Sequence, residues 1–123
     1  LALGSKAISP LDFTRMWEIF TACSSLHQND SFCQKYGNAL QQVVSILSDN
    51  SVRLLSFPAD NWFTAPNTYA KSGTSRNFVD GRVCWWKEKF TVCVWVGNLD
   101  ASPMLDAGHG TAGVLRYHVM NLL

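Results

Sequence analysis

The chain of 123 residues is poor in charge, because Asp, Glu, Lys and Arg make up only 15% of it. A typical soluble domain carries roughly 25% charged residues. Some of the surface is therefore expected to face further polypeptide or a partner. The formal net charge is +1, and no basic run occurs in which Lys or Arg alternates with aromatic residues. These features argue against a nucleic-acid-binding protein.

The sequence also lacks the spacings that mark metal sites and membrane spans. Its four cysteines form no Cys-x-x-Cys pair and have no His at the distance typical of zinc ligands. No stretch approaches the ~18 apolar residues of a membrane-spanning helix, and the first residues do not have the pattern of a signal peptide. We therefore expect no metal site and no cofactor. Any export signal or membrane anchor is expected outside this chain.

One short segment combines a cation, two hydroxyl groups and a glycine. Lys71 offers a positive charge, and Ser72 and Thr74 offer hydrogen-bond donors. Gly73 has no side chain, so that a ligand can approach the backbone closely. These residue types suit the binding of an anion along the edge of a strand.

Alternating apolar residues and turn residues predict strands at 67–74, 79–86 and 90–97. A charged Lys-Glu-Lys turn joins the last two, and the short connections predict an antiparallel meander. On this register Cys84 and Cys93 come nearly opposite each other, so that their Cα atoms should lie within ~7 Å. An oxidising compartment could join them, although two buried free thiols are the favoured alternative.

Helical periodicity predicts two helices before the sheet and one after it. Ser9 and Pro10 begin the first helix, in which Asp12 suits the first turn and which runs to about Leu26. The second helix spans Tyr36–Leu47, residues 51–66 are expected to be irregular, and the last helix spans 111–123. The inward-facing residues of the first helix are expected to be Leu11, Met16, Trp17, Ile19, Phe20 and Cys23. Those of the last helix are expected to be Val114, Leu115, Val119 and Leu122.

The predicted fold class is therefore α/β: a three-stranded antiparallel sheet, two N-terminal helices and a C-terminal helix that packs on the sheet. The tryptophans of the strands, Trp85, Trp86 and Trp95, are expected to lie in the core. Asp100 and Asp106 occur in a turn-rich segment and are expected to form turns rather than to act as catalytic carboxylates.

The ordered run from Lys71 to Met104 resembles the C-terminal part of the transpeptidase domain of class A penicillin-binding proteins. The matching residues are Lys71-Ser72-Gly73-Thr74-Ser75, Asn77-Phe78, Asp80, Thr91-Val92, Val94-Trp95-Val96-Gly97-Asn98, Asp100 and Ser102-Pro103-Met104. Upstream, residues 1–5, 9–14 and 46–50 resemble segments that precede this signature in the same family. The resemblance implies that residues 1–123 are a single partial domain, the C-terminal half of a transpeptidase domain and thus a fragment of that fold.

What the resemblance implies for function is peptidoglycan cross-linking by serine acyl transfer from a D-Ala-D-Ala stem peptide. Lys71 would then supply positive potential, and Ser72 and Thr74 would bind the carboxylate of the stem peptide or of a β-lactam, with Gly73 between them. The backbone N–H of Thr74 would be one of two oxyanion donors. The location implied is the periplasm, or the outer face of the bacterial cytoplasmic membrane.

The family's nucleophile motif, Ser-x-x-Lys, does not occur in this sequence. We therefore assign no catalytic residue, and we expect the chain to be inactive without the remainder of the transpeptidase domain as its partner. The family's second motif, Ser-x-Asn, has two look-alikes: Ser48–Asn50, interpreted as a helix end, and Ser75–Asn77, which overlaps the signature. The alternative function is a non-catalytic binding or assembly module derived from such a domain.

Overall fold

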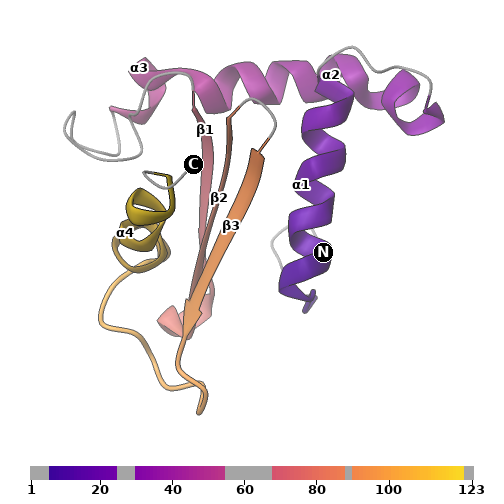
Figure 1. Cartoon of the computed structure of the whole chain (residues 1–123). Coiled ribbons are helices and arrows are strands. Elements are labelled where there is room, and N and C mark those ends of the chain that lie inside the picture. The colour runs from indigo at the N-terminus through magenta and orange to yellow at the C-terminus, as the bar shows by residue number, and fades with distance from the viewer. Residues whose placement is uncertain (1–5, 25–29, 55–67, 88–89, 121–123) are drawn as a thin grey trace.

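The computed structural model describes residues 6–24, 30–54, 68–87 and 90–120 (Figure 1). Its elements are, in order, α1 (Pro10–Ser24), α2 (Ser31–Ser48), α3 (Asn50–Arg53), β1 (Tyr69–Thr74), the 3-10 helix η2 (Arg76–Phe78), β2 (Asp80–Lys87), β3 (Phe90–Gly97) and α4 (Gly108–Met120). The strands form one antiparallel sheet in the order β1-β2-β3. The predicted α/β class and the predicted meander are confirmed.

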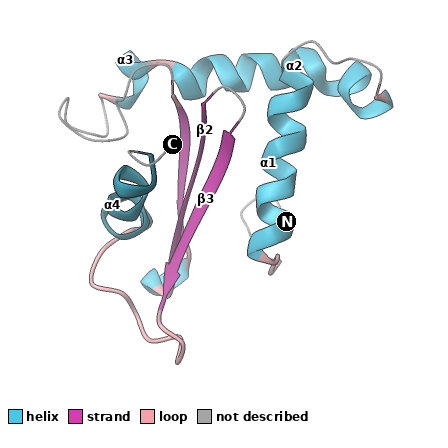
Figure 2. Cartoon of the chain, viewed as in Figure 1, coloured by secondary structure: helices cyan, strands magenta, loops and turns pink. Residues whose placement is uncertain are grey.

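The sheet lies between helices (Figures 1 and 2). Helix α4 lies on one side of the sheet and α1 on the other, while α2 runs across the ends of the strands. Successive side chains of a strand point to opposite faces. Val83 and Trp85 of β2 consequently pack toward α4, whereas Cys84 and Trp86 pack toward α1. The middle strand is therefore buried on both faces.

The core on the α4 side contains mostly small and β-branched side chains. Its buried residues are Ala70, Val83, Trp85 and Ala112, and Val92, Val94, Val96 and Val119 pack against them. Helix α4 comes very close to the sheet at its first residue, since a Cβ on Gly81 would lie 2.4 Å from the Cα of Gly108. Glycine at position 81 allows this contact between backbones.

The core on the α1 side is an aromatic cluster around Trp17 and Trp86. The two rings lie 5.0 Å apart, and Tyr69 stacks on Trp86 at 5.2 Å with an interplanar angle of 5°. Phe13 and Phe20 complete the cluster, one helical turn on either side of Trp17. This narrow stripe of α1 is what faces the sheet.

Two disulfides cross-link the chain. Cys84 and Cys93 are direct partners in the β2–β3 register, with Cα atoms 4.1 Å apart, so the predicted juxtaposition is confirmed. The favoured alternative of two free thiols is wrong, because direct cross-strand partners lie within bonding distance. The other disulfide, Cys23–Cys33, joins α1 to α2 and was not predicted.

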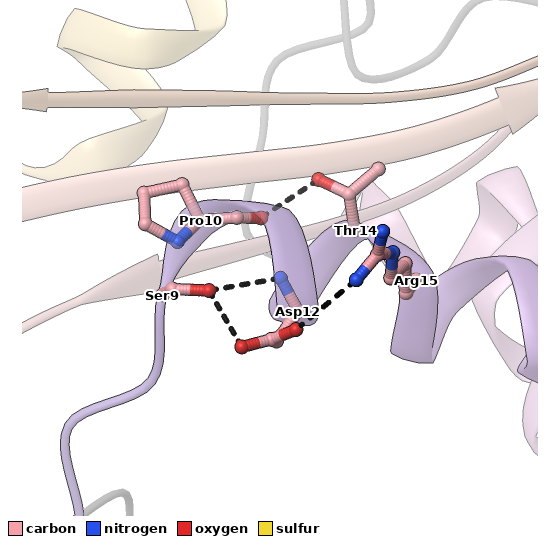
Figure 3. A network of polar contacts seen from close by, with 5 residues as sticks. All are labelled: Ser9, Pro10, Asp12, Thr14 and Arg15. Atoms are coloured by element: carbon pink, nitrogen blue, oxygen red, sulfur yellow. Dashed lines mark hydrogen bonds and ion pairs between the residues drawn. The ribbon is translucent and has the colours of Figure 1, made fainter.

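The first helix begins as predicted (Figure 3). The hydroxyl of Ser9 accepts a hydrogen bond from the N–H of Asp12 at 3.1 Å and donates to its carboxylate at 2.7 Å. Arg15 pairs with the same carboxylate at 3.6 Å, and the Thr14 hydroxyl donates to the Pro10 carbonyl at 2.9 Å. The exposed first turn is thus capped by its own side chains.

The second helix begins at Ser31 rather than at Tyr36, because Asp30 caps it by accepting from the N–H of Phe32 at 2.6 Å. It ends at Ser48, which confirms the interpretation of Ser48–Asn50 as a helix end. Asp49 then caps α3 by accepting from the N–H of Ser51 at 2.8 Å. The region predicted to be irregular therefore begins with a short helix, and its residues 55–66 lie outside the described residues.

Several predicted inward positions are wrong. Leu11 and Ile19 are 60% and 54% exposed, Met16 is also exposed, and Trp95 is 48% exposed. Only one stripe of α1 contacts the sheet, so these apolar residues of α1 face away from it.

Helix α4 begins at Gly108 rather than at residue 111. Its residues Ala112 and Val119 pack toward the sheet, whereas Val114 and Leu115, which were predicted to face inward, are exposed. Leu26 and Leu122 lie outside the described residues.

Candidate functional site at the edge of β1

The segment Lys71–Thr74 forms the last four residues of β1, an edge strand. Among the described residues, no strand pairs with its outer side. Ser72 is half-buried, and Lys71 and Thr74 are exposed. The segment with anion-binding chemistry is thus open to a ligand along the outer edge of the sheet.

The register determines which backbone groups point outward. In antiparallel pairs, hydrogen-bonded partners have Cα atoms about 5.5 Å apart and non-hydrogen-bonded partners about 4.5 Å apart, in alternation. Cys84 and Cys93, with Cα atoms 4.1 Å apart, are a non-hydrogen-bonded pair between β2 and β3. The backbone N–H and C=O of Cys84 therefore point away from β3, toward its β1 partner Lys71. The backbone of Ser72 and of Thr74 consequently points away from β2, to the free edge.

A further hydrogen bond agrees with this alternation. Two residues beyond Gly73, the N–H of Ser75 donates to the carbonyl oxygen of Asp80 at 2.9 Å, toward β2. Odd-numbered residues of this segment therefore bond inward, and even-numbered residues point outward. The N–H of Thr74, the expected oxyanion donor, lies on the open side.

The side chains of the segment start on two different faces. Cross-strand partners share a face, so Lys71 lies with Cys84 on the α1 face. Ser72 and Thr74 lie on the α4 face, where the Thr74 hydroxyl accepts a hydrogen bond from the N–H of Gly108 at 3.0 Å. Their hydroxyls share a face, as the alternation predicts.

The ammonium of Lys71 nevertheless reaches the free edge. It donates to the carbonyl oxygen of Ser72, which points outward by the register above. The long side chain therefore bends around the edge of its own strand. A cation and the outward backbone groups of Ser72 and Thr74 meet along one side of the sheet.

The contact with Gly108 gives the Thr74 hydroxyl a fixed environment. A hydroxyl that accepts one hydrogen bond keeps its own proton for donation. Because the acceptor side of the Thr74 oxygen receives the N–H of Gly108, its proton remains available to an anion. The start of α4 thus orients a predicted ligand-binding group.

Gly73 has a role that the sequence did not reveal. A Cβ on Gly73 would lie 3.2 Å from the Cγ of Arg82, its partner on β2. The missing side chain therefore makes room for Arg82 on the α1 face. Sequence reasoning did not single out Arg82 as a functional residue. The signal that could have revealed it is a charged residue in the middle strand of the sheet, among apolar neighbours.

Arg53 holds the chain where it enters β1. Its guanidinium donates to the carbonyl oxygens of Leu47 and of Thr68, the latter at 2.6 Å, and so joins the end of α2 to the residue before the strand. Burial lowers the pKa of Arg53, and the neighbouring carboxylate of Asp49 opposes this effect. The charged side chain is thus part of the frame that positions β1.

The remaining acidic candidates form turns, as predicted. Asp100 accepts from the N–H of Ser102 at 3.0 Å, which is the largest cause of its lowered pKa, and Asp106 accepts from the N–H of Ala107. Across the described residues, no three or more His, Cys, Asp or Glu side chains gather as metal ligands. In the same ranges, no helix is both long and apolar enough to span a membrane.

Comparisons with protein-family models, with curated proteins and with solved structures found no match for this chain. The resemblance to penicillin-binding proteins accordingly rests on the residues of the sequence, and the function that it implies remains a hypothesis to be tested.

Proposed function

We propose that the chain is part of a penicillin-binding D-Ala-D-Ala transpeptidase, which cross-links peptidoglycan by serine acyl transfer. In this proposal Lys71, Ser72, Gly73 and Thr74 supply the carboxylate-binding wall of the cleft, and the N–H of Thr74 supplies an oxyanion donor. The nucleophile belongs to the remainder of the domain. The ligand is the peptidoglycan stem peptide or a β-lactam.

The arrangement of the β1 edge carries this proposal. The Lys71 ammonium bends to the same side as the outward N–H of Thr74. A carboxylate laid along this edge would meet a positive charge and hydrogen-bond donors from neighbouring residues, which is the combination that stabilises carboxylates most strongly. A carbonyl under attack would find a backbone donor that is already in place.

Uncovered apolar surface supports the remainder of the domain as a partner. Helices α1 and α2 expose large apolar residues, among them Leu11, Ile19 and Ile46. The outer strand β3 has no charged side chain, although exposed edge strands commonly carry one against unwanted pairing. Further polypeptide of the same domain would cover both features.

The disulfides support the proposed location. Both pairs of cysteines are joined, and the described residues include no free cysteine. Disulfides persist in oxidising compartments such as the bacterial periplasm and are rare in the cytosol. We therefore propose the periplasm, or the outer face of the cytoplasmic membrane, as the location of the protein.

A matched pair of peptides tests the carboxylate-binding wall. We expect a diacetylated Lys-D-Ala-D-Ala peptide to shift the backbone amide signals of Ser72 and Thr74 in an NMR titration. The same peptide with a C-terminal amide should shift them much less, because it has no carboxylate for Lys71. Equal shifts from both peptides, or none from either, would contradict the proposed wall.

The assignment of the nucleophile to the remainder of the domain needs a separate measurement. Incubated alone with a fluorescent penicillin, the chain should form no covalent adduct by intact mass, because it has no Ser-x-x-Lys. An adduct on any serine of this chain would overturn the assignment. Labelling should appear when an upstream segment that carries Ser-x-x-Lys and Ser-x-Asn is added.

A second candidate is a non-catalytic binding or assembly module. The exposed apolar residues of α1 and α2 favour it, since they would also suit a protein partner. The surrounding gene distinguishes the two candidates. An upstream coding segment with Ser-x-x-Lys and Ser-x-Asn would favour the transpeptidase, and its absence would favour the module.

A further inference from the structure

A pocket of about 310 Å³ lies between the start of α1 and strand β3. Its walls include Ile8, Phe13, Arg82, Cys93, Val94 and Trp95. Cys93 and its partner Cys84 face α1, so the pocket is on the α1 side of the sheet, at the strand opposite to β1. It is therefore separate from the edge that presents Lys71, Ser72 and Thr74.

The walls combine flat apolar groups with one cation. The guanidinium carbon of Arg82 lies over the Phe13 ring, 5.0 Å from its centre, which is the distance of a cation–π contact. Trp95 lies against Gly97, where an added Cβ would come within 2.7 Å of the indole. Glycine at that position therefore leaves room for the indole, which lines the pocket.

The guanidinium of Arg82 has N–H donors that its ion pair with Asp80 does not use. Its ion pair with Asp80 runs through one nitrogen, Nη2, at 3.3 Å, and both side chains are partly exposed, which makes the pair weak. A guanidinium has five N–H donors in a planar fork. A carboxylate or sulfonate could therefore bind Arg82 by two parallel hydrogen bonds while Asp80 keeps its contact.

We propose that this pocket binds a small anion with a flat apolar body, an aromatic carboxylate or sulfonate. The apolar body lies between Phe13 and Trp95, and the acid group binds Arg82. The volume falls at the small end of the range of ligand sites, about 300–1,000 Å³, which are mostly apolar with a few polar groups that fix orientation. The proposal does not depend on the transpeptidase function.

Two dyes that differ in one charge test the proposal on the unaltered chain. Anilinonaphthalene sulfonate has the flat body and the acid group, and phenylnaphthylamine has the same body without the acid. We expect both to bind at one site, the sulfonate about tenfold more tightly, as one charge-assisted contact implies. Fluorescence titration gives the affinities, and amide NMR shifts should centre on Phe13 and Val94.

A matched pair of arginine variants then locates the charge that is recognised. Arg82→Gln should reduce sulfonate binding about tenfold and leave phenylnaphthylamine unchanged, whereas Arg76→Gln, at the exposed η2, should change neither. Far-ultraviolet circular dichroism checks that both variants are folded. If Arg82→Gln does not fold, the comparison of the two dyes on the unaltered chain still decides.

Several results would overturn the proposal. These are equal affinity of the two dyes, failure of both to bind, or an equal loss of sulfonate binding in the two arginine variants. Shifts centred on Leu11 and Ile19 would also overturn it, because the dyes would then bind the exposed face of α1 rather than the pocket.

Discussion

The outer strands β1 and β3 pair with the same middle strand, yet their free edges have opposite character. On β1 the ammonium of Lys71 reaches the outward backbone groups, and the hydroxyl of Thr74 lies on the adjoining α4 face. On β3 the sequence Phe-Thr-Val-Cys-Val-Trp-Val-Gly contains no charged side chain. In the described parts of the chain, no further strand covers either edge.

The backbone alone does not distinguish the two edges. By the alternation that starts from the Cys84–Cys93 pair, β1 points the groups of Ser72 and Thr74 outward, and β3 points those of Cys93 and Trp95 outward. Only the side chains differ. An edge with a cation and hydroxyls can remain in water and bind an anion, whereas an uncharged edge is prone to pair with another strand.

The largest effect should come from removal of the cross-link on the β3 side. We expect the double variant Cys84→Ala/Cys93→Ala to lower the free energy of unfolding by about 2–4 kcal/mol, because the unfolded chain gains freedom. Urea unfolding measures this loss. Hydrogen exchange should rise more in β3 than in β1, which the disulfide does not include.

The other disulfide supplies the matched control. Cys23–Cys33 closes a segment of nearly the same length, with a sequence separation of 10 against 9. Removal of either disulfide should therefore cost a similar free energy in the chain-entropy description. A loss below ~1 kcal/mol for the β2–β3 pair alone would show that β3 does not depend on its cross-link.

The sequence predicts the sheet well because its signals are local. Alternation and the charged turn place β3 at its observed bounds and β2 within one residue at each end, and that register brings Cys84 and Cys93 together. The Cys23–Cys33 bond could not be predicted in this way, because it depends on how α1 packs on α2. Leu11 and Ile19 are exposed because only one stripe of α1 contacts the sheet, which also depends on packing between elements.

The candidate site was predictable by residue type more than by geometry. Lys71, Ser72 and Thr74 stand out as a cation beside hydroxyls in a strand. Neither the hydrogen bond from Gly108 to Thr74 nor the space that Gly73 leaves for Arg82 could be predicted from neighbours in sequence. Position 108 lies 34 residues beyond Thr74, so this contact exists only once α4 has docked.

The second-largest loss of stability is expected from a substitution on the β1 side of the sheet. Gly81 pairs with Thr74, and a Cβ there would lie 2.4 Å from the Cα of Gly108. We expect Gly81→Ala to cost about 1–3 kcal/mol by overpacking and to shift the amide signals of Thr74 and Gly108. Urea unfolding and amide NMR measure the two effects.

The control for this variant should change stability in the opposite direction. A Cβ on Gly37, inside α2, would lie 3.8 Å from the carbonyl oxygen of Cys23, an ordinary contact and the nearest one outside the helix's own backbone. Gly37→Ala should therefore stabilise the protein by about 0.5–1 kcal/mol through the helix backbone. If both alanine variants changed the free energy of unfolding in the same direction, the close approach of Gly108 to Gly81 would not limit stability.

A smaller effect should follow from an exchange of charge between the two edges. Phe90→Lys places a cation on β3 at a side chain that is 52% exposed, and Lys71→Val removes the one on β1. Each should change the free energy of unfolding by less than about 0.5 kcal/mol, as most surface substitutions do.

The charge exchange should act on self-association instead. Sedimentation velocity over a range of concentrations should show less self-association for the first variant and more for the second. Equal association would mean that edge charge is not what separates β1 from β3.

The smallest effect concerns two exposed carboxylates, Asp49 between α2 and α3 on the way to β1, and Asp100 just after β3. Both have lowered pKa values, but the main cause is the Ser51 hydroxyl for Asp49 and the backbone N–H of Ser102 for Asp100. Since a pKa lowered on folding stabilises the folded state above the unfolded pKa, this small contribution is lost as the pH falls through the folded pKa.

Ser51→Ala should raise the pKa of Asp49 clearly, whereas Ser102→Ala should raise that of Asp100 much less, because alanine keeps the N–H. A titration followed by the NMR signals of the carboxyl carbons measures both, and equal changes would show that hydroxyls hold the two turns alike.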